Sequence, residues 1–401
     1  MAHPSVHVIP PLILIGIPIL LVALVIARCS SFYRGHVDRE IAGARYHAID
    51  GLRGYLALGV AFHHVFLNYQ YYQSGEWDLF GSGLGVFLGQ GAVAVFFMIT
   101  AFLFWNRAID ENGHLDAYRF YISRVRRIVP MYLVAAALVI VTAFLITGFT
   151  LQVSLAELSR SLLDWILFTF ASPLPINGLA RTWLINTVFW SLVWEWKFYL
   201  VLPFLAIFSG PRYRWYLVAL TTGIILLFDE HSLAWFFLCG ALAAMIVRWP
   251  LVQSLARTWG ASVVSVAAVV AAVTYTPTPY GPTGATLLLI PFVAISVGNS
   301  LFGILTCRPA RLLGILSYSV YLLHNWVLFV VALVVNAYIP IKGMSQSSYW
   351  IVGAAVVLIT VLLSSMTYRF VESPFLKTKK VGRPSGLESL YGSAQVRDIT
   401  R

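Results

Sequence analysis

The stretch RVRRIVPMYLVAAALVIVTAFLITGF, residues 124–149, decides the class of fold. Its apolar part, residues 128–149, is long enough to cross the hydrocarbon core of a bilayer, because a spanning helix takes about 20 apolar residues. Three arginines precede it directly, namely Arg124, Arg126 and Arg127. Basic residues collect on the cytoplasmic side of membrane proteins, so this pattern predicts a transmembrane helix that begins at the cytoplasmic face.

The composition of the whole chain also indicates a membrane protein. Of its 401 residues, 59% are hydrophobic and only 11% are charged, and the mean hydropathy is +0.81. A soluble protein has about 25% charged residues, so soluble enzyme folds are excluded. The net charge of +11 is explained by basic cytoplasmic loops rather than by a nucleic-acid partner. The 3 cysteines have no paired spacing, so we expect neither a disulfide framework nor a metal site.

Apolar runs along the chain predict an all-α integral membrane protein with about eleven transmembrane helices. The predicted spans are 9–27, 52–71, 84–105, 128–149, 184–208, 215–229, 232–248, 260–275, 284–305, 313–337 and 349–371. Residues 153–169 differ, because apolar and charged side chains lie on opposite faces of a helix there. We expect that segment to lie in the membrane interface rather than to cross the bilayer.

The basic residues also predict an orientation. With the N-terminus outside, 22 of the 27 Lys and Arg residues lie on the cytoplasmic side, and only Arg160, Arg181 and Lys342 lie on the other. We therefore expect a multi-pass protein of the inner (plasma) membrane with a cytoplasmic C-terminus. The first span is predicted to be a retained helix rather than a signal peptide, because no Lys or Arg precedes it.

Arg53, His64, Glu195 and His324 are ionisable residues inside the predicted spans. A charged group at bilayer depth costs about 2.5–3.5 kcal/mol, so each is a candidate functional residue. His64 follows Arg53 by eleven residues, which is about 16 Å along a helix. His324 and Glu195 lie equally far from the predicted ends of their own spans. We therefore expect two imidazoles and a carboxylate to meet near the midplane as an acid–base cluster.

Each of these residues also has a structural alternative. Neighbouring residues on a helix point about 100° apart, so one of His63 and His64 is expected to hydrogen-bond a neighbouring helix instead. His324 could instead be a packing residue that is hydrogen-bonded to a hydroxyl group, and Glu195 could pair with an arginine. A pair between Glu195 and Lys197 is disfavoured, because side chains two residues apart lie on different faces.

The arginines of residues 124–127 have two interpretations as well. A helix N-terminus flanked by guanidinium groups is suited to binding phosphate. On charge alone, however, an ordinary topology anchor is favoured.

Six segments in order resemble the motifs of the membrane acyltransferase family 3, many of whose members O-acetylate bacterial surface glycans. They are IDGLRGYLALGVAFHH (49–64), GAVAVFFMITAFLFW (91–105), SRVRRIVPMY (123–132), WSLVWEWKFYLVLP (190–203), GILSYSVYLLHN (314–325) and VESP (371–374). The first has the family's Arg-x10-His spacing in Arg53 and His64. The second departs from the family pattern, because Thr100 and Ala101 replace Ser and Gly.

The resemblance implies a division of the chain and an activity. Residues 1–48 would be an additional helix and cytoplasmic loop, residues 49–375 a membrane acyltransferase domain of ten helices, and residues 376–401 a disordered cytoplasmic tail. The implied reaction moves an acyl group, most often acetyl, from cytoplasmic acyl-CoA to a hydroxyl of a cell-envelope or secreted glycan. Acyl-CoA would be a co-substrate, and no tightly bound cofactor is expected.

The family motifs assign expected roles to individual residues. His64 would act as general base, and Glu195 would orient its ring as the carboxylate does in a catalytic triad. The expected catalytic residues are His64, Arg53, Glu195 and His324; those for acyl-CoA are Arg124, Arg127, Arg53 and Tyr132; those for the acceptor and acyl group are Tyr318, Ser317 and Trp190.

Other functions remain open at this stage. A proton-coupled transporter or glycan exporter would use the same buried His and Glu side chains as a proton relay, and a non-catalytic subunit of a glycan-export complex is a second rival. The acceptor could be a lipid-linked glycan, a lipopolysaccharide chain, an exopolysaccharide or a small molecule. Membrane lipid and a separate glycan-assembly or esterase-like protein are expected partners. Trp165, Trp183 and Tyr349 are candidates for stacking on sugar rings.

Overall fold

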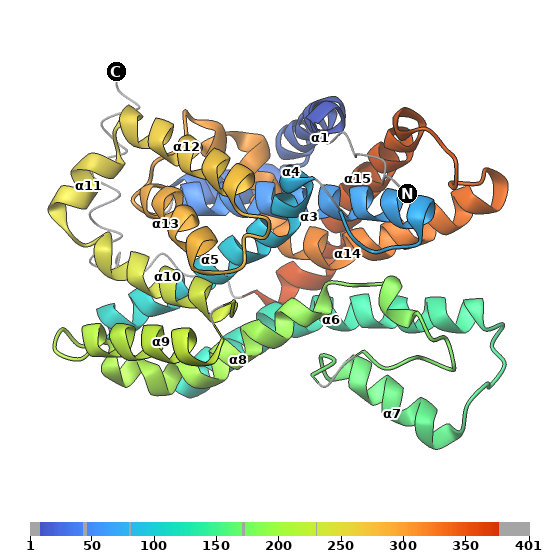
Figure 1. Ribbon diagram of the computed structural model, residues 1–401, viewed down its shortest axis with the longest axis horizontal. Coiled ribbons are helices and arrows are strands. Elements are labelled where there is room, and N and C mark those ends of the chain that lie inside the picture. Colours follow the sequence, from blue (N-terminus) through green and yellow to red (C-terminus); the bar gives the residue numbers. More distant parts are fainter. Residues whose placement is uncertain (1–8, 43–45, 80–81, 171–172, 230, 377–401) are drawn as a thin grey trace.

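The computed structural model describes residues 9–42, 46–79, 82–170, 173–229 and 231–376, and every regular element in these ranges is a helix (Figure 1). The predicted outer N-terminus (1–8), Arg45 and the tail (377–401) lie outside the described residues. The first helices are α1 Ile9–Cys29, α2 Ser31–Ala42, α3 His47–Ser74, α4 Gly83–Val86, α5 Ala92–Asp110, α6 Ala117–Ile146, α7 Leu155–Ile166 and α8 Phe189–Ala206. The others are α9 Arg214–Phe228, α10 Ala234–Ile246, α11 Pro250–Ala256, α12 Trp259–Tyr275, α13 Pro282–Ser296, α14 Arg308–Tyr338 and α15 Gln346–Thr367.

The all-helical prediction is confirmed for the described part of the chain, but the number of spans is not. Five described helical segments are long and apolar enough to cross a membrane, and the sharply bent pair of α10 and α11 would make a sixth. The apolar helices α9, α12 and α13 are shorter. The count of eleven and the orientation therefore stay predictions, whereas several apolar helices together indicate a multi-pass membrane protein.

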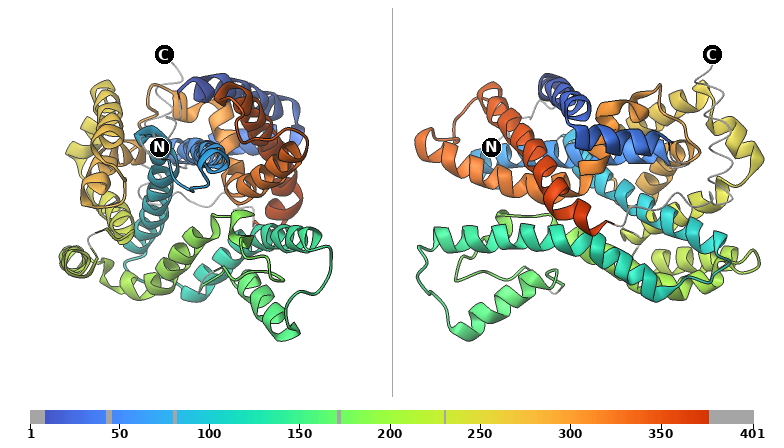
Figure 2. Two further views of the ribbon diagram at one scale, coloured as in Figure 1. Left: turned by 45° about the vertical axis from the view of Figure 1, so that its right-hand side comes forward. Right: turned by 180° about the vertical axis from the view of Figure 1, so that it is seen from behind.

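Helices α3 and α14 form the centre of the molecule and lie side by side (Figures 1 and 2). They approach closely because glycines face each other. A Cβ added to Gly54 of α3 would lie 2.7 Å from the backbone nitrogen of Gly314 in α14, and a Cβ on Gly314 would clash with the carbonyl oxygen of Asp50. Small residues are the usual means by which helices pack closely in membranes. The contact fixes the relative height of the two histidines that the sequence places on these helices.

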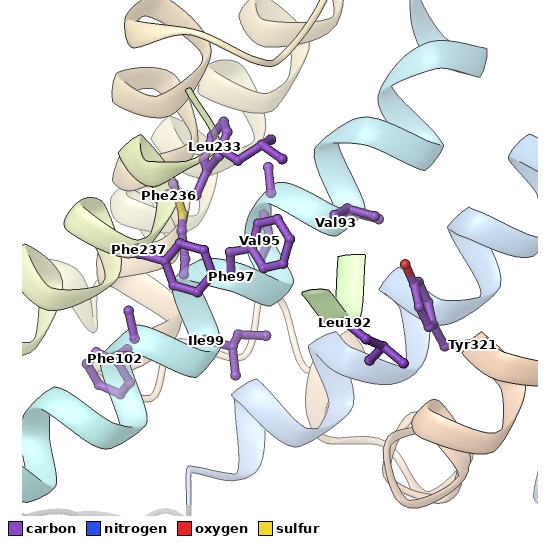
Figure 3. Packing of buried hydrophobic residues seen from close by; sticks show 14 of the residues in the cluster. Val93, Val95, Phe97, Ile99, Phe102, Leu192, Leu233, Phe236, Phe237 and Tyr321 are labelled. Atoms are coloured by element: carbon purple, nitrogen blue, oxygen red, sulfur yellow. The ribbon is translucent and has the colours of Figure 1, made fainter. Parts of the chain in front are cut away.

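A second packed layer joins α5 to α10 and leads to α8 and α14 (Figure 3). The rings of Phe97 and Phe237 stack with centroids 4.7 Å apart. Leu192 of α8 and Tyr321 of α14 belong to the same buried cluster, and the Tyr321 hydroxyl is 2.6 Å from Ser191 Oγ. This layer holds α8 against the central helix pair.

The predicted start of the fourth span was wrong. Helix α6 begins at Ala117, where the Asp116 side chain accepts a hydrogen bond from the Arg119 backbone N–H. Arg124 and Arg127 therefore lie inside a continuous helix, and a helix N-terminus beside them cannot bind phosphate. Hydropathy detects only the apolar part of a helix, so it misses the polar turns that extend beyond the lipid.

The predicted amphipathic helix exists as α7, which lies apart from the central helices in Figures 1 and 2. It begins with a capping box, in which Ser154 and Glu157 bond reciprocally to each other's backbone N–H groups. Its length of 12 residues is too short to cross a bilayer.

Candidate active site

Two histidines from the central helices form a buried pair. His324 Nε2 of α14 lies 3.0 Å from His64 Nδ1 of α3. The side chains are almost wholly enclosed, with His64 9% and His324 1% exposed. The structure thus brings together the two imidazoles that the sequence placed at one depth.

The hydrogen bonds of the pair determine where its protons lie. His324 Nδ1 is 3.1 Å from the Val320 carbonyl oxygen, which can only accept, so this nitrogen carries the proton in a neutral ring. His324 Nε2 is then an acceptor, and His64 Nδ1 donates to it and to the Val60 carbonyl, 3.0 Å away. His64 Nε2 is left as the unprotonated, basic nitrogen.

Thr187 is the group that faces this basic nitrogen. Its hydroxyl Oγ1 lies 3.0 Å from His64 Nε2 and donates to it. Thr187 belongs to the non-helical segment 185–188, which two amides fasten to its surroundings: Asn186 Nδ2 donates to the Leu322 carbonyl at 2.9 Å, and Asn325 Nδ2 to the Leu184 carbonyl at 3.2 Å. Thr187 was not among the expected site residues, because hydropathy places residues 184–208 in one continuous span. The two adjacent polar residues Asn186 and Thr187 were the available signal.

His63 takes the structural alternative. Its Nδ1 donates to the Gly85 carbonyl at 2.7 Å, which ties α3 to α4, and its ring is turned away from that of His64 by 83°. Among the two neighbouring histidines, His64 is therefore the one that contacts the His324 ring.

A cavity of about 450 Å³ opens beside Thr187. Its walls come from the loop after α3, from the end of α7 and the segment that follows it, and from the residues before and at the start of α8. The lining residues are Trp77, Trp165, Thr169, Phe170, Pro173, Trp183, Asn186, Thr187, Phe189, Trp190, Val193 and Trp194. Trp190, expected at the acceptor site, lines this cavity and is 42% exposed, so the cavity reaches the surface.

Glu195 does not join the histidine pair. Among the described residues it has no hydrogen bond or ion pair with either imidazole, and its carboxylate accepts from the Tyr199 hydroxyl. The Arg124 guanidinium lies 4.6 Å from the centroid of the Phe104 ring and 5.9 Å from that of the Tyr199 ring, and it donates to Ser123 Oγ at 2.8 Å. The expected three-residue cluster is therefore corrected: α8 turns Glu195 towards α6, and His324 occupies the orienting position that the sequence assigned to a carboxylate.

A second buried carboxylate holds Arg127. Glu372, at the end of the π-turn Tyr368–Glu372 after α15, lies 3.2 Å from Arg127 Nη1, and its side chain is 1% exposed. Ser319 of α14 donates a hydrogen bond to the other carboxylate oxygen. Glu372 was quoted as part of a motif but was not among the expected site residues, because a carboxylate at the end of a span reads as an ordinary loop charge.

Arg53 completes this group, which we call the charge cluster: Arg53, Arg124, Arg127, Glu195 and Glu372. Arg53 acts electrostatically on both Glu195 and Glu372 and lies 4.0 Å from Asp50. Three guanidinium groups and two carboxylates thus offset each other in a partly dry environment.

The remaining expected residues lie elsewhere or serve packing. Tyr318 donates to the Ile128 carbonyl at 2.9 Å, with the Arg127 guanidinium 5.5 Å from its ring centroid. Ser317 is buried, and its hydroxyl has no hydrogen-bond partner among the described residues. Tyr132 is fully buried and donates to the Trp165 carbonyl at 2.6 Å, so it fastens the last turn of α7.

The chain is similar in sequence to known acyltransferases. Residues 46–369 match a family model described as an acyltransferase domain. The chain is also similar to a Bacillus subtilis (strain 168) protein named "Putative peptidoglycan O-acetyltransferase YrhL", with 23% identity over 378 residues. This alignment covers 81% of the chain but 54% of the relative, so the chain spans about half the length of that protein. No solved structure matches the chain.

Proposed function

Because the chain belongs to the membrane acyltransferase family 3, we propose that it transfers an acyl group from cytoplasmic acyl-CoA to a hydroxyl of a cell-envelope glycan. The name of its relative favours acetyl as the acyl group and peptidoglycan as the first acceptor to test. The chain lies in the inner membrane in this proposal, with the basic loops and the acyl-CoA on the cytoplasmic side, as the distribution of its 27 Lys and Arg residues favours.

The position of His64 Nε2 is the observation that carries the proposal. This nitrogen is free to accept a proton, and it faces Thr187 at the edge of the cavity. Arg53, eleven residues earlier on α3, lies on nearly the same face of the helix and about 16 Å along its axis. A proton acceptor and a set of phosphate-binding groups are thus separated by a distance that the long, thin pantetheine arm of coenzyme A can bridge.

The charge cluster is the proposed donor site. Arg127 forms an ion pair with Glu372, and Arg124 lies over the ring of Tyr199, whose hydroxyl donates to Glu195. Phosphate groups bind guanidinium through the same charge-assisted hydrogen bonds that carboxylates use. An incoming diphosphate can therefore replace carboxylate contacts without leaving a buried cation unpaired.

The transfer step uses the histidine pair as its base. The acceptor hydroxyl takes the place of the Thr187 hydroxyl at His64 Nε2. Its oxygen bonds to the thioester carbonyl carbon while its proton passes to Nε2, and the imidazolium is stabilised through Nδ1–H by His324 Nε2. The carbon–sulfur bond then breaks, and the coenzyme A thiolate takes the proton from His64 and leaves as the thiol.

The proposal is tested in membranes that contain the full chain. Labelled acetyl-CoA is added, envelope glycans are isolated and the label on them is counted, while mass analysis of glycans from cells with and without the protein identifies the acylated unit. We expect label on glycan only when the protein is present. Glycan flux coupled to a pH gradient, without any labelled glycan, would instead identify a transporter.

A further inference from the structure

The tryptophan-rich cavity beside Thr187 carries an inference that rests on the proposed function and deepens it. Five of its lining residues are tryptophans, namely Trp77, Trp165, Trp183, Trp190 and Trp194. The cavity adjoins the histidine pair directly, because Thr187 contacts His64 Nε2 and the Trp77 ring lies 6.4 Å from the His64 ring. We propose that it is the acceptor subsite and binds a neutral sugar ring whose hydroxyl is acylated.

The chemistry of the lining excludes other classes of ligand. No lining residue is charged, so neither a phosphate nor a cationic group would find a counter-charge there. A volume of about 450 Å³ lies within the range of small-molecule sites. A purely apolar occupant, such as a lipid tail, would leave the hydrogen-bonding groups of the cavity without partners, which costs free energy.

The polar groups of the lining residues are the hydroxyls of Thr169 and Thr187, the amide of Asn186 and the indole N–H groups of the tryptophans. Trp165 Nε1 donates to the Leu174 carbonyl at 2.8 Å. Within the described part of the chain, no acceptor takes the N–H of Trp77, Trp183 or Trp190. A pyranose matches both features of these side chains, because its C–H face stacks on an aromatic ring and its hydroxyl oxygens accept from N–H groups. The cavity therefore combines stacking surfaces with donors in the way that a sugar ring requires.

The cavity also lies on the appropriate side of the histidine pair. Along α3, Arg53 of the charge cluster lies before His64, whereas Tyr71 and the following Trp77 lie after it. Trp77 and Trp183 contact each other edge to face with centroids 5.8 Å apart, which fixes two walls of the cavity. Donor and acceptor sites are thus on opposite sides of the base, so both substrates can reach it together. In this arrangement the Thr187 hydroxyl marks the position of the acceptor hydroxyl.

The test separates binding of the sugar from chemistry on the donor. Membranes containing Trp183→Ala or Trp190→Ala are given labelled acetyl-CoA, and two products are counted: label on glycan and label released as acetate. We expect label on glycan to fall about tenfold, which corresponds to about 1.4 kcal/mol and is the size of one lost aromatic contact. The ratio of free acetate to acylated glycan should rise by a similar factor, because water replaces the sugar beside His64.

Matched controls come from the exposed tryptophans of another region. Trp215 and Trp249, whose ring centroids are 6.2 Å apart, lie outside both sites, so Trp215→Ala and Trp249→Ala should retain wild-type values of both products. Trp190→Phe keeps a stacking ring without the N–H and should fall between wild type and Trp190→Ala. Immunodetection in the membrane fraction confirms that each variant is present.

Each outcome decides one of the two proposals. Label on glycan within about twofold of wild type in both cavity variants overturns the acceptor subsite, because twofold is only about 0.4 kcal/mol. A parallel loss of both products overturns it too, since the cavity would then serve the donor reaction. Absence of labelled glycan with the wild-type chain overturns the proposed function itself.

Discussion

The histidine pair and the charge cluster lie along the same helix but are built on opposite principles. Each ring N–H of His64 and His324 is matched by a neutral acceptor, and no charged side chain hydrogen-bonds either ring among the described residues. In the charge cluster, Arg127 forms an ion pair with Glu372, and Arg124 acts electrostatically on Glu195. A membrane interior admits ions chiefly as pairs, so the imidazoles have neutral partners and the arginines of the charge cluster are compensated by carboxylates.

This difference predicts different sensitivities. The histidine pair depends on which ring nitrogen carries a proton. Removing one nitrogen that accepts a hydrogen bond should therefore lower the rate of transfer. The charge cluster depends on the balance between its positive and negative side chains. Removing one charge of a pair should therefore destabilise the protein, and removing both should restore its stability.

The largest expected effect is that of His64→Ala. Removing the general base should lower transfer of label to glycan at least about 100-fold, in keeping with the usual contribution of such a group. His63→Asn is the matched control, because an amide N–H can replace the bond to the Gly85 carbonyl. Wild-type transfer in His64→Ala would contradict the assignment of the base.

The second prediction concerns the balance of the charge cluster. Arg127→Gln leaves Glu372 buried without its cation and should cost about 3 kcal/mol of unfolding free energy. The double variant Arg127→Met with Glu372→Gln should regain most of that stability. Both the single and the double variant should have a higher KM for acetyl-CoA than wild type, because both lack the Arg127 guanidinium. Thermal unfolding in detergent and initial rates measure the two quantities. A wild-type KM in the double variant would mean that Arg127 does not bind the donor.

Substituting His324 separates orientation from proton acceptance. The amide oxygen of His324→Gln can still accept from His64 Nδ1, whereas His324→Leu cannot. We expect about a tenfold loss of transfer for Gln and about 100-fold for Leu. Equal losses in the two variants would show that His324 does more than orient and stabilise His64.

The smallest predicted effect is at Thr187. Thr187→Val removes the hydroxyl that holds the His64 ring in position until the acceptor hydroxyl replaces it, and a ring oriented less well before the acceptor binds should lower transfer about fivefold. Thr187→Ser restores the hydroxyl and should recover most of the rate. A Val variant as active as wild type would remove Thr187 from the positioning of the base.

Much of the central arrangement could be predicted from residue counts alone. His64 and His324 lie at similar distances from the predicted cytoplasmic ends of their spans, and a fixed helical rise converts those counts into depth. The same counts do not predict how a helix is rotated about its axis, and so do not predict which neighbouring helix a side chain faces. Glu195 has a suitable depth but faces the arginines of α6, and hydropathy could not reveal that.

Two wrong predictions, the start of α6 and the helical conformation of residues 185–188, have one physical cause. Hydropathy reports lipid exposure rather than backbone conformation. Helix α6 therefore began before its predicted start, at Ala117, and the non-helical residues around Thr187 were taken for helix. Irregular backbone at membrane depth occurs where it lines a cavity, and residues 185–188 lie beside one.

The glycine contact between α3 and α14 has a consequence for turnover. Backbones that touch cannot slide, and a shift of one residue along either axis would move the imidazoles apart by about 1.5 Å. The two central helices, α3 and α14, are therefore expected to keep the same relative position throughout the proposed transfer reaction. In the proposed reaction, substrate entry and product release therefore depend on the elements that contact these two helices through side chains, above all α6 with the Arg127–Glu372 ion pair and α8 with the cavity wall.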